Sequence, residues 1–209
     1  MKYTLYKVMR TMLSPIFRIL FRPRIIGRQN IPANGAAVIA GNHKHALDPI
    51  LIDISTERVV RTLAKKELHD GKFGFMFRSV GTIPVDLHAK KNPEALKAAV
   101  EALRKGELVN VSPEAKRNYT NELLLPFKFG AAAMAYRTRA VIVPYAITGD
   151  YKLLPKNRPT VIFGKPFQAG KDIATTNKQL YEIIAGLLRR TMSPDELAQK
   201  HFTPYDDRS

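Results

Sequence analysis

The chain of 209 residues contains no cysteine, and this absence excludes disulfide bonds and thiolate-ligated metal sites. Acidic residues are also scarce, because none precedes Asp48 and the net charge is +16. The basic residues of this first part are Lys2, Lys7, Arg10, Arg18, Arg22, Arg24, Arg28 and Lys44. A surface this positive attracts nucleic acid, acidic lipids, or acidic proteins and substrates, and charge alone does not choose between them.

Residues 3–22 lack the roughly 20 uncharged apolar residues of a transmembrane helix, because Arg10 and Arg18 interrupt the run. A secretory signal also fits poorly, since no small-residue cleavage site follows. On a helix at about 100° per residue the polar side chains share one sector of about 120°. Pro15 predicts a kinked helix or two short helices. A wide apolar face opposite a basic stripe indicates a helix in an anionic membrane interface, and packing on the domain is the alternative.

The rest of the chain alternates predicted strands and helices, and its 45% hydrophobic content is enough for one well-buried core. Strands are expected at 36–40, 59–64, 82–85, 107–111, 140–147 and 160–164, and helices at 72–79, 93–105, 129–138 and 177–191. This order predicts an α/β fold with a largely parallel or mixed sheet flanked by helices, whose ligands gather at strand ends. No repeat or interdomain linker appears, and residues 201–209 are expected to fray.

The stretch AAVIAGNHKHALDPILI, residues 36–52, places His43 and Asp48 directly after a buried strand. The spacing allows the carboxylate to reach one imidazole nitrogen while the other faces a cleft, which is a general base with its orienting group. Asp48 could instead be only the N-cap of a helix that starts at Pro49. No cysteine and no G-x-S-x-G turn supply a nucleophile, so the activated hydroxyl is expected on the substrate. His45 suggests a metal motif, but His69, His88 and His201 lack matching spacing, and no metal is expected.

Several motifs in order, over residues 36–168, resemble the glycerolipid acyltransferase family that includes 1-acyl-glycerol-3-phosphate (lysophosphatidic acid) acyltransferases. These motifs are NHKHALD at 42–48, LAKKEL at 63–68, FGFMFRSVGTIPVD at 73–86, SPEAKRN at 112–118, LLLPFKFGAAAMA at 123–135 and AVIVPYAITGDYK at 140–152. His43, four intervening residues and Asp48 are similar to the first family motif. That pattern alone is a weak signal, and its companions in order make it specific.

The resemblance implies that His43 removes the proton from the acceptor hydroxyl and that Asp48 stabilises the imidazolium. It implies that Glu114 and Arg117 line the acceptor site, with Lys66 a weaker candidate for the phosphate. It further implies a thioester of acyl carrier protein or coenzyme A as cosubstrate, no cofactor, and a peripheral or monotopic position on the cytoplasmic face of the cell membrane. Residues 1–27 are then predicted as a membrane-association segment with anionic lipids as partners, and residues 28–209 as the catalytic domain.

The chain departs from the family pattern near the expected acceptor site. Ser112, Ala115 and Lys116 replace the usual Phe, Gly and Thr, and Leu87 stands where many members carry arginine. Lys116, or Lys90 and Lys91, could supply the missing positive charge. Another lysolipid or an amino-linked lipid is therefore an alternative acceptor. A basic nucleic-acid-binding protein is the rival from another class, and no recognisable RNA- or DNA-reading motif supports it.

Overall fold

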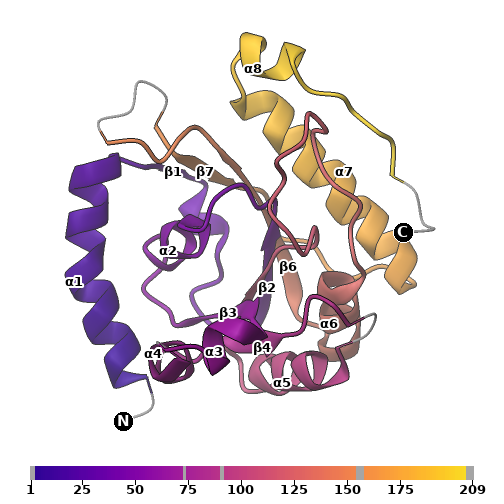
Figure 1. The fold of residues 1–209 in the computed structure, drawn as a ribbon. Helices are drawn as coiled ribbons and strands as arrows, with labels where there is room; N and C mark the ends of the chain where they lie inside the picture. Colours follow the sequence, from indigo (N-terminus) through magenta and orange to yellow (C-terminus); the bar gives the residue numbers. More distant parts are fainter. Residues whose placement is uncertain (1–2, 73, 90–91, 154–157, 206–209) are drawn as a thin grey trace.

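A seven-stranded mixed sheet forms the centre of the protein in a computed structural model that describes residues 3–72, 74–89, 92–153 and 158–205 (Figure 1). The strands are β1 Arg24–Ile26, β2 Ala37–Gly41, β3 Val60–Lys65, β4 Ile83–Val85, β5 Leu108–Val111, β6 Val141–Thr148 and β7 Thr160–Phe163, in the spatial order β1-β7-β6-β2-β5-β3-β4. Only the β6–β7 pair is antiparallel among these strands. The predicted α/β class is confirmed.

Helices cover both faces of the sheet. The helices are α1 Thr4–Phe21, α2 Asp48–Asp53, α3 Lys66–Asp70, α4 Gly74–Ser79, α5 Pro93–Arg104, α6 Gly130–Thr138, α7 Ile173–Thr191 and α8 Pro194–Ala198, with a 3-10 turn η1 at Arg28–Asn30. Side chains alternate along β2, so Val38 and Ala40 pack with α5, α6 and α7, whereas Ala37 and Ile39 pack with α1 and α2. Because both faces of β2 are buried, its sequence is a continuous apolar run rather than an alternating one.

The expected strands and helices lie within a few residues of the observed ones, with three differences. Helix α7 begins at Ile173 rather than at 177, because the side chain of Asp172 accepts a hydrogen bond from the Thr175 amide and caps it. The short elements β1, α3 and α8 were not predicted, since three to five residues carry little periodicity. The prediction that residues 201–209 fray is wrong for 201–205, and residues 206–209 lie outside the described part.

The C-terminal stretch is held against the body by specific contacts. The His201 amide donates to the Asn121 carbonyl at 2.8 Å, and the Leu123 amide donates to the His201 carbonyl at 2.7 Å. The Tyr181 hydroxyl donates to the Thr203 carbonyl at 2.6 Å. These partners lie far back in the sequence, so a polar C-terminal composition gave no sign of them.

Of the two alternatives expected for this segment, one helix or two short ones, the structure has one continuous helix α1 with Pro15 inside it. Both halves are anchored to the end of α2 and the segment that follows it, which offsets the hydrogen bond that proline removes. The Tyr6 hydroxyl donates to Asp53 at 3.1 Å in the first half. Arg10 donates to the carbonyls of Thr56 and Arg58, and Arg18 donates to the Ile54 carbonyl at 2.9 Å.

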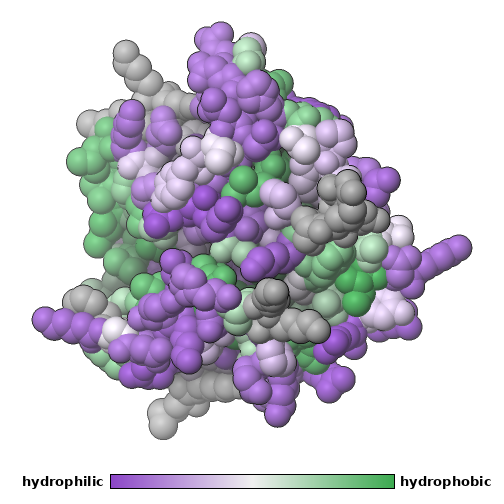
Figure 2. Space-filling view, turned by 45° about the vertical axis from the view of Figure 1, so that its right-hand side comes forward, coloured by the Kyte–Doolittle hydropathy of each residue, from purple (hydrophilic) through white to green (hydrophobic). Residues whose placement is uncertain are grey.

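The orientation of α1 is the reverse of that of an ordinary surface helix. Tyr6 and Phe17 are buried against the body, and the hydrogen bonds of Arg10 and Arg18 lie on the same side. Seven large apolar side chains of α1 are between 40% and 70% exposed, most of them turned away from the body and Leu13 at the edge of the packed side: Leu5, Val8, Met12, Leu13, Ile16, Ile19 and Leu20. Figure 2 shows hydrophobic side chains gathered along its left edge, where α1 lies in Figure 1. These seven residues are called the outer face of α1 below. Across the described ranges, no helix combines the length and hydrophobicity that crossing a bilayer requires.

Candidate active site

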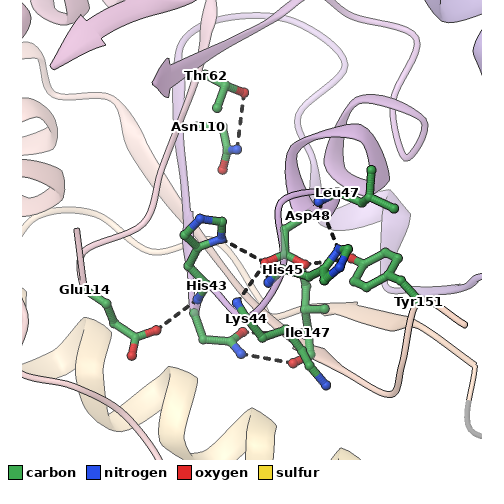
Figure 3. A network of polar contacts seen from close by, with 11 residues as sticks. His43, Lys44, His45, Leu47, Asp48, Thr62, Asn110, Glu114, Ile147 and Tyr151 are labelled. Carbon is green, nitrogen blue, oxygen red and sulfur yellow. Dashed lines mark hydrogen bonds and ion pairs between the residues drawn. The ribbon is translucent and has the colours of Figure 1, made fainter. Parts of the chain in front are cut away.

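The candidate site lies where three neighbouring parallel strands end. Strand β2 pairs in parallel with β5 on one side and β6 on the other, so their carboxyl ends share one edge of the sheet. His43 follows β2, Glu114 follows β5 and Tyr151 follows β6 (Figure 3). Three stretches far apart in sequence therefore meet at this edge.

Asn42 fixes the exit of the chain from β2. Its buried side-chain amide donates to the Ile147 carbonyl at 3.0 Å and accepts from the Ile147 amide at 2.7 Å. A side chain thus continues the hydrogen-bond ladder between β2 and β6 by one step. This lets the main chain turn away at His43 without leaving the Ile147 backbone groups unpaired.

His43 and Asp48 form the predicted pair. The Nδ1 atom of His43 lies 2.9 Å from Oδ2 of Asp48. Because a carboxylate only accepts, Nδ1 carries the proton and donates it, which leaves Nε2 with a free lone pair. The side chain of Asp48 is 3% exposed and that of His43 is 26% exposed. The imidazole is therefore accessible to a substrate, whereas the carboxylate is not.

The carboxylate of Asp48 accepts hydrogen bonds from four groups that lie outside α2. Its Oδ2 atom also accepts from the amides of Lys44 and His45, each at 2.8 Å. Its Oδ1 atom accepts from the Tyr151 hydroxyl at 2.7 Å. The N-cap position of α2 belongs to Leu47, so the carboxylate of Asp48 turns back toward the loop. The reading of Asp48 as only a helix cap is excluded by this geometry.

Glu114 clamps the main chain beside His43. Its Oε1 atom accepts from the His43 amide and its Oε2 atom accepts from the Leu125 amide, both at 2.9 Å. The residue is 3% exposed. Burial raises the pKa of Glu114 to about 7, although the two amide hydrogen bonds oppose this shift. The Asn118 amide completes the clamp by donating to the His43 carbonyl at 2.9 Å.

A cavity of about 2080 Å³ is lined by His43 and Asp48 and extends between the sheet, α1, α4 and α5. Apolar side chains of these helices form much of its wall, among them Met9, Leu13, Met76, Phe77, Leu96 and Val100. Its volume exceeds the roughly 300 to 1,000 Å³ typical of small-molecule sites. It is large enough, and apolar enough, to hold long hydrocarbon chains.

The predicted binding residues occupy different places relative to this cavity. Arg117 and Lys116 line it and are exposed, and the Arg117 guanidinium lies 5.4 Å from the ring centre of Tyr119. Lys66 is exposed at the start of α3 and does not line the cavity, whereas its neighbour Lys65 does. Glu114 does not line it either, since both carboxylate oxygens face main-chain amides. Acceptor-binding roles for these residues stay predictions.

The sequence departures can also be placed. Ser112 and Leu87 line the cavity. Ala115 has a φ of 57°, in the left-handed region where a Cβ atom costs about 1 to 2 kcal/mol. A glycine, which the family usually has, would fit this position without strain. Lys90 and Lys91 lie outside the described residues.

His45 and Tyr151 complete the surroundings of Asp48. The Nδ1 atom of His45 accepts from the Leu47 amide at 3.2 Å, so its imidazole is engaged locally. Its ring stacks on Tyr151 with centres 4.6 Å apart. Sequence reasoning did not single out Tyr151, although it lies within the AVIVPYAITGDYK motif, because it is 103 residues from Asp48 and nothing local indicates their contact. Within the described ranges, no group of three or more His, Cys, Asp or Glu residues could hold a metal ion.

Comparisons with known proteins agree on one family. A family model described as "Acyltransferase" matches residues 22–148. A 1-acyl-sn-glycerol-3-phosphate acyltransferase of Bacillus subtilis is 28% identical over 167 residues, which are 78% of this chain and 82% of that protein. A protein of the same name from Helicobacter pylori is 32% identical over 121 residues, which are 57% of this chain and 51% of the relative.

The fold also has a solved counterpart. The crystal structure of the 1-acyl-sn-glycerophosphate (LPA) acyltransferase PlsC from Thermotoga maritima superposes with a TM-score of 0.73. It covers 88% of this chain and 78% of the other at 23% sequence identity. This likeness establishes a shared fold.

Proposed function

Because this chain belongs to the acyltransferase family, we propose that it moves a fatty acyl group from a thioester to the sn-2 hydroxyl of 1-acyl-glycerol-3-phosphate, giving phosphatidic acid. The observation that carries the proposal is the hydrogen-bonded His43–Asp48 pair on the wall of a large apolar cavity. The apolar wall suits acyl chains. Arg117 and Lys116 on the same wall suit a phosphate group.

In the proposed mechanism, Nε2 of His43 removes the proton of the acceptor hydroxyl as its oxygen attacks the thioester carbonyl. The negative charge of Asp48 stabilises the imidazolium that forms, and its hydrogen bond keeps Nε2 directed at the cavity. Collapse of the tetrahedral intermediate breaks the carbon–sulfur bond. The departing thiolate then receives the proton from Nε2, so the imidazole returns to its starting state.

Arg117 is the proposed phosphate ligand, because a guanidinium can donate two parallel hydrogen bonds to two phosphate oxygens. Arg117→Lys keeps the charge and loses this pair of donors, so it should raise the Michaelis constant for the acceptor more than that for the thioester. Lys116 lies beside it and can share the phosphate. The double change with Lys116→Thr should therefore cost more than the sum of the single changes. An effect confined to the donor would place Arg117 in the other half of the site.

The proposed place of action is the cytoplasmic face of the cell membrane, with α1 lying in the interface. Support comes from the seven exposed apolar side chains of the outer face and from the net charge of +16, which favours an anionic leaflet. A positive surface would also favour an acidic acyl carrier protein as the donor, and coenzyme A thioesters are the alternative. No cofactor is required by the proposed chemistry.

One assay tests the function. Purified protein is incubated with lysophosphatidic acid in vesicles and with acyl carrier protein or coenzyme A thioesters in separate arms, and phosphatidic acid is measured by mass spectrometry. His43→Ala should lower kcat by about 10² to 10⁴-fold. The matched control is His88→Ala, because the His88 side chain is 87% exposed. Thioester consumption only with another lysolipid or an amino-lipid would correct the acceptor, and equal activity of the His43 variant would refute the mechanism.

A further inference from the structure

Tyr151 contacts the carboxylate oxygen of Asp48 to which residues 43–45 do not donate. The three other donors to this carboxylate belong to residues 43–45 and bind Oδ2, whereas Oδ1 accepts from the Tyr151 hydroxyl at 2.7 Å. A carboxylate held through both oxygens cannot rotate about its Cβ–Cγ bond without breaking hydrogen bonds. The phenol therefore fixes the plane of the group that orients His43.

The hydroxyl group of Tyr151 is well suited to donate a lasting hydrogen bond to Asp48. Burial and the nearby charge of Asp48 raise its pKa, so the hydroxyl keeps its proton at neutral pH and donates it to the carboxylate. The backbone at Gly149, two residues before Tyr151, is also sterically restricted. Gly149 has a φ of 77°, and a Cβ atom there would lie 1.9 Å from the Arg158 carbonyl oxygen. The Lys44 ammonium group donates to the Gly149 carbonyl, which ties this loop to the one bearing His43.

The ring of Tyr151 is enclosed by groups from two other elements. His45 stacks on it with an angle of 20° between the planes. Phe17 and Phe21 of α1 contact it edge-on, with ring centres 6.1 Å and 5.9 Å away. Such aromatic contacts contribute about 0.5 to 1.5 kcal/mol each and restrict the ring geometrically. A continuous line of contacts thus runs from α1 through Tyr151 and Asp48 to Nδ1 of His43.

We propose that Tyr151 is a positioning residue for the proposed acyl transfer, and that the packing of α1 through Phe17 and Phe21 holds it in place. The inference rests on the proposed function. It assigns α1 a second role besides contact with lipid, since seating of this helix on the body stabilises the geometry of the general base.

The first test compares Tyr151→Phe, which keeps the ring and removes the hydroxyl, with Tyr136→Phe as a matched control on the partly exposed Tyr136 of α6. Tyr151→Phe should lower kcat about ten-fold and leave both Michaelis constants within about two-fold, as expected for loss of a hydrogen bond to a charged group that touches neither substrate. A change in kcat below about two-fold, or a loss confined to one Michaelis constant, would overturn the assignment.

The second test asks whether Tyr151 acts through Asp48. In an Asp48→Asn background, adding Tyr151→Phe should cost less than about two-fold in kcat, because residues that act as a unit are not additive. Phe21→Ala should lower kcat about three-fold alone and have no further effect in the Tyr151→Phe background. If the kcat losses of Asp48→Asn and Tyr151→Phe multiplied in the double variant, the coupling to Asp48 would be overturned. If Phe21→Ala left kcat unchanged, α1 would have no part in positioning Tyr151.

A third measurement does not require turnover. The Nδ1 proton of His43 should give a low-field proton NMR signal that His43→Ala removes. In Tyr151→Phe this proton should exchange faster with water, while the Tyr136→Phe signal matches that of the unmodified protein. An unchanged exchange rate would refute the positioning role. If the unmodified protein transfers no acyl group with any donor, the proposed function fails, and this signal still decides whether Tyr151 orders the pair.

Discussion

Glu114→Gln should reveal how much of the site is held by one buried carboxylate. Glu114 accepts from the amides of His43 and Leu125 at 2.9 Å each. Glutamine offers one oxygen and one NH₂ group, so one of these two buried amides would lose its acceptor, whereas a carboxyl group keeps a lone pair on each oxygen even when it is protonated. An unpaired buried donor costs about 1 to 3 kcal/mol. At pH 5, the variant should therefore be less stable than the unmodified protein by about that amount.

The difference should shrink as the pH rises. Glu114 has an ordinary pKa of 4.5, which burial raises to about 7 in the folded protein. Between these values the unfolded chain releases a proton that the folded protein keeps, so the stability that this group contributes falls with increasing pH. One unit of pKa difference corresponds to about 1.4 kcal/mol, which gives a loss of roughly 2 to 3 kcal/mol between pH 5 and pH 8. Glutamine does not titrate and escapes this loss.

Urea unfolding of both proteins at pH 5 and pH 8 measures the two effects separately. Glu182→Gln on the exposed side of α7 is the matched control, and it should change neither the stability at pH 5 nor the stability difference between pH 5 and pH 8. If the free energy of unfolding changed by the same amount between pH 5 and pH 8 in Glu114→Gln and in the unmodified protein, the raised pKa would be refuted. Equal stability at pH 5 would refute the clamp on the two amides. Loss of kcat in a folded variant would further link this clamp to the placement of His43.

Three further predictions concern other parts of the molecule. Ala115→Gly should raise the free energy of unfolding by about 0.5 to 1 kcal/mol, since relief of left-handed strain exceeds the entropy that glycine adds to the unfolded chain; lower stability would contradict this. Burial raises the pKa of Asp53 from 3.8 to about 7, so the unmodified protein should lose about 2 to 4 kcal/mol of stability between pH 4 and pH 8. Asp53→Asn should abolish this loss in urea titrations, while its amide oxygen still accepts from Tyr6. Unchanged pH dependence would refute this. Met12→Gln with Ile19→Gln should weaken partitioning onto anionic vesicles about ten-fold or more in a sedimentation assay, whereas Leu153→Gln, equally exposed elsewhere, should not; equal partitioning would exclude the outer face of α1 as the lipid contact.

Local patterns predicted the parts of the site that lie close together in the sequence. His43 and Asp48 are five residues apart after an apolar strand, so chain geometry alone brings them into reach. Tyr151 could not be predicted in this way, because its contact with Asp48 depends on β6 lying beside β2. The clamp by Glu114 was also missed, since its partners are main-chain amides, which every non-proline residue carries.

The same limit applies to α1. Periodicity predicted an amphipathic helix, but it could not decide which side faces the body. Arg10 and Arg18 lie on the packed side because carbonyls of residues 54–58 accept their hydrogen bonds, which no hydrophobicity pattern records. The two alternatives of an interfacial helix and a packed helix therefore do not exclude each other. One side of α1 packs, and the other side exposes its apolar side chains, as the proposed lipid contact requires.

The outward orientation of α1 also governs the colloidal behaviour of the purified protein. Large exposed apolar patches promote self-association, and mutual repulsion between molecules carrying a net charge of +16 opposes it. Salt screens the repulsion over a Debye length of about 10 Å at 0.1 M and leaves the apolar attraction intact. The protein should therefore associate as ionic strength rises, contrary to the salting-in of many soluble proteins, and mild detergent should reverse this by covering the seven side chains of the outer face. Light scattering during a salt titration, with and without detergent, would follow this directly.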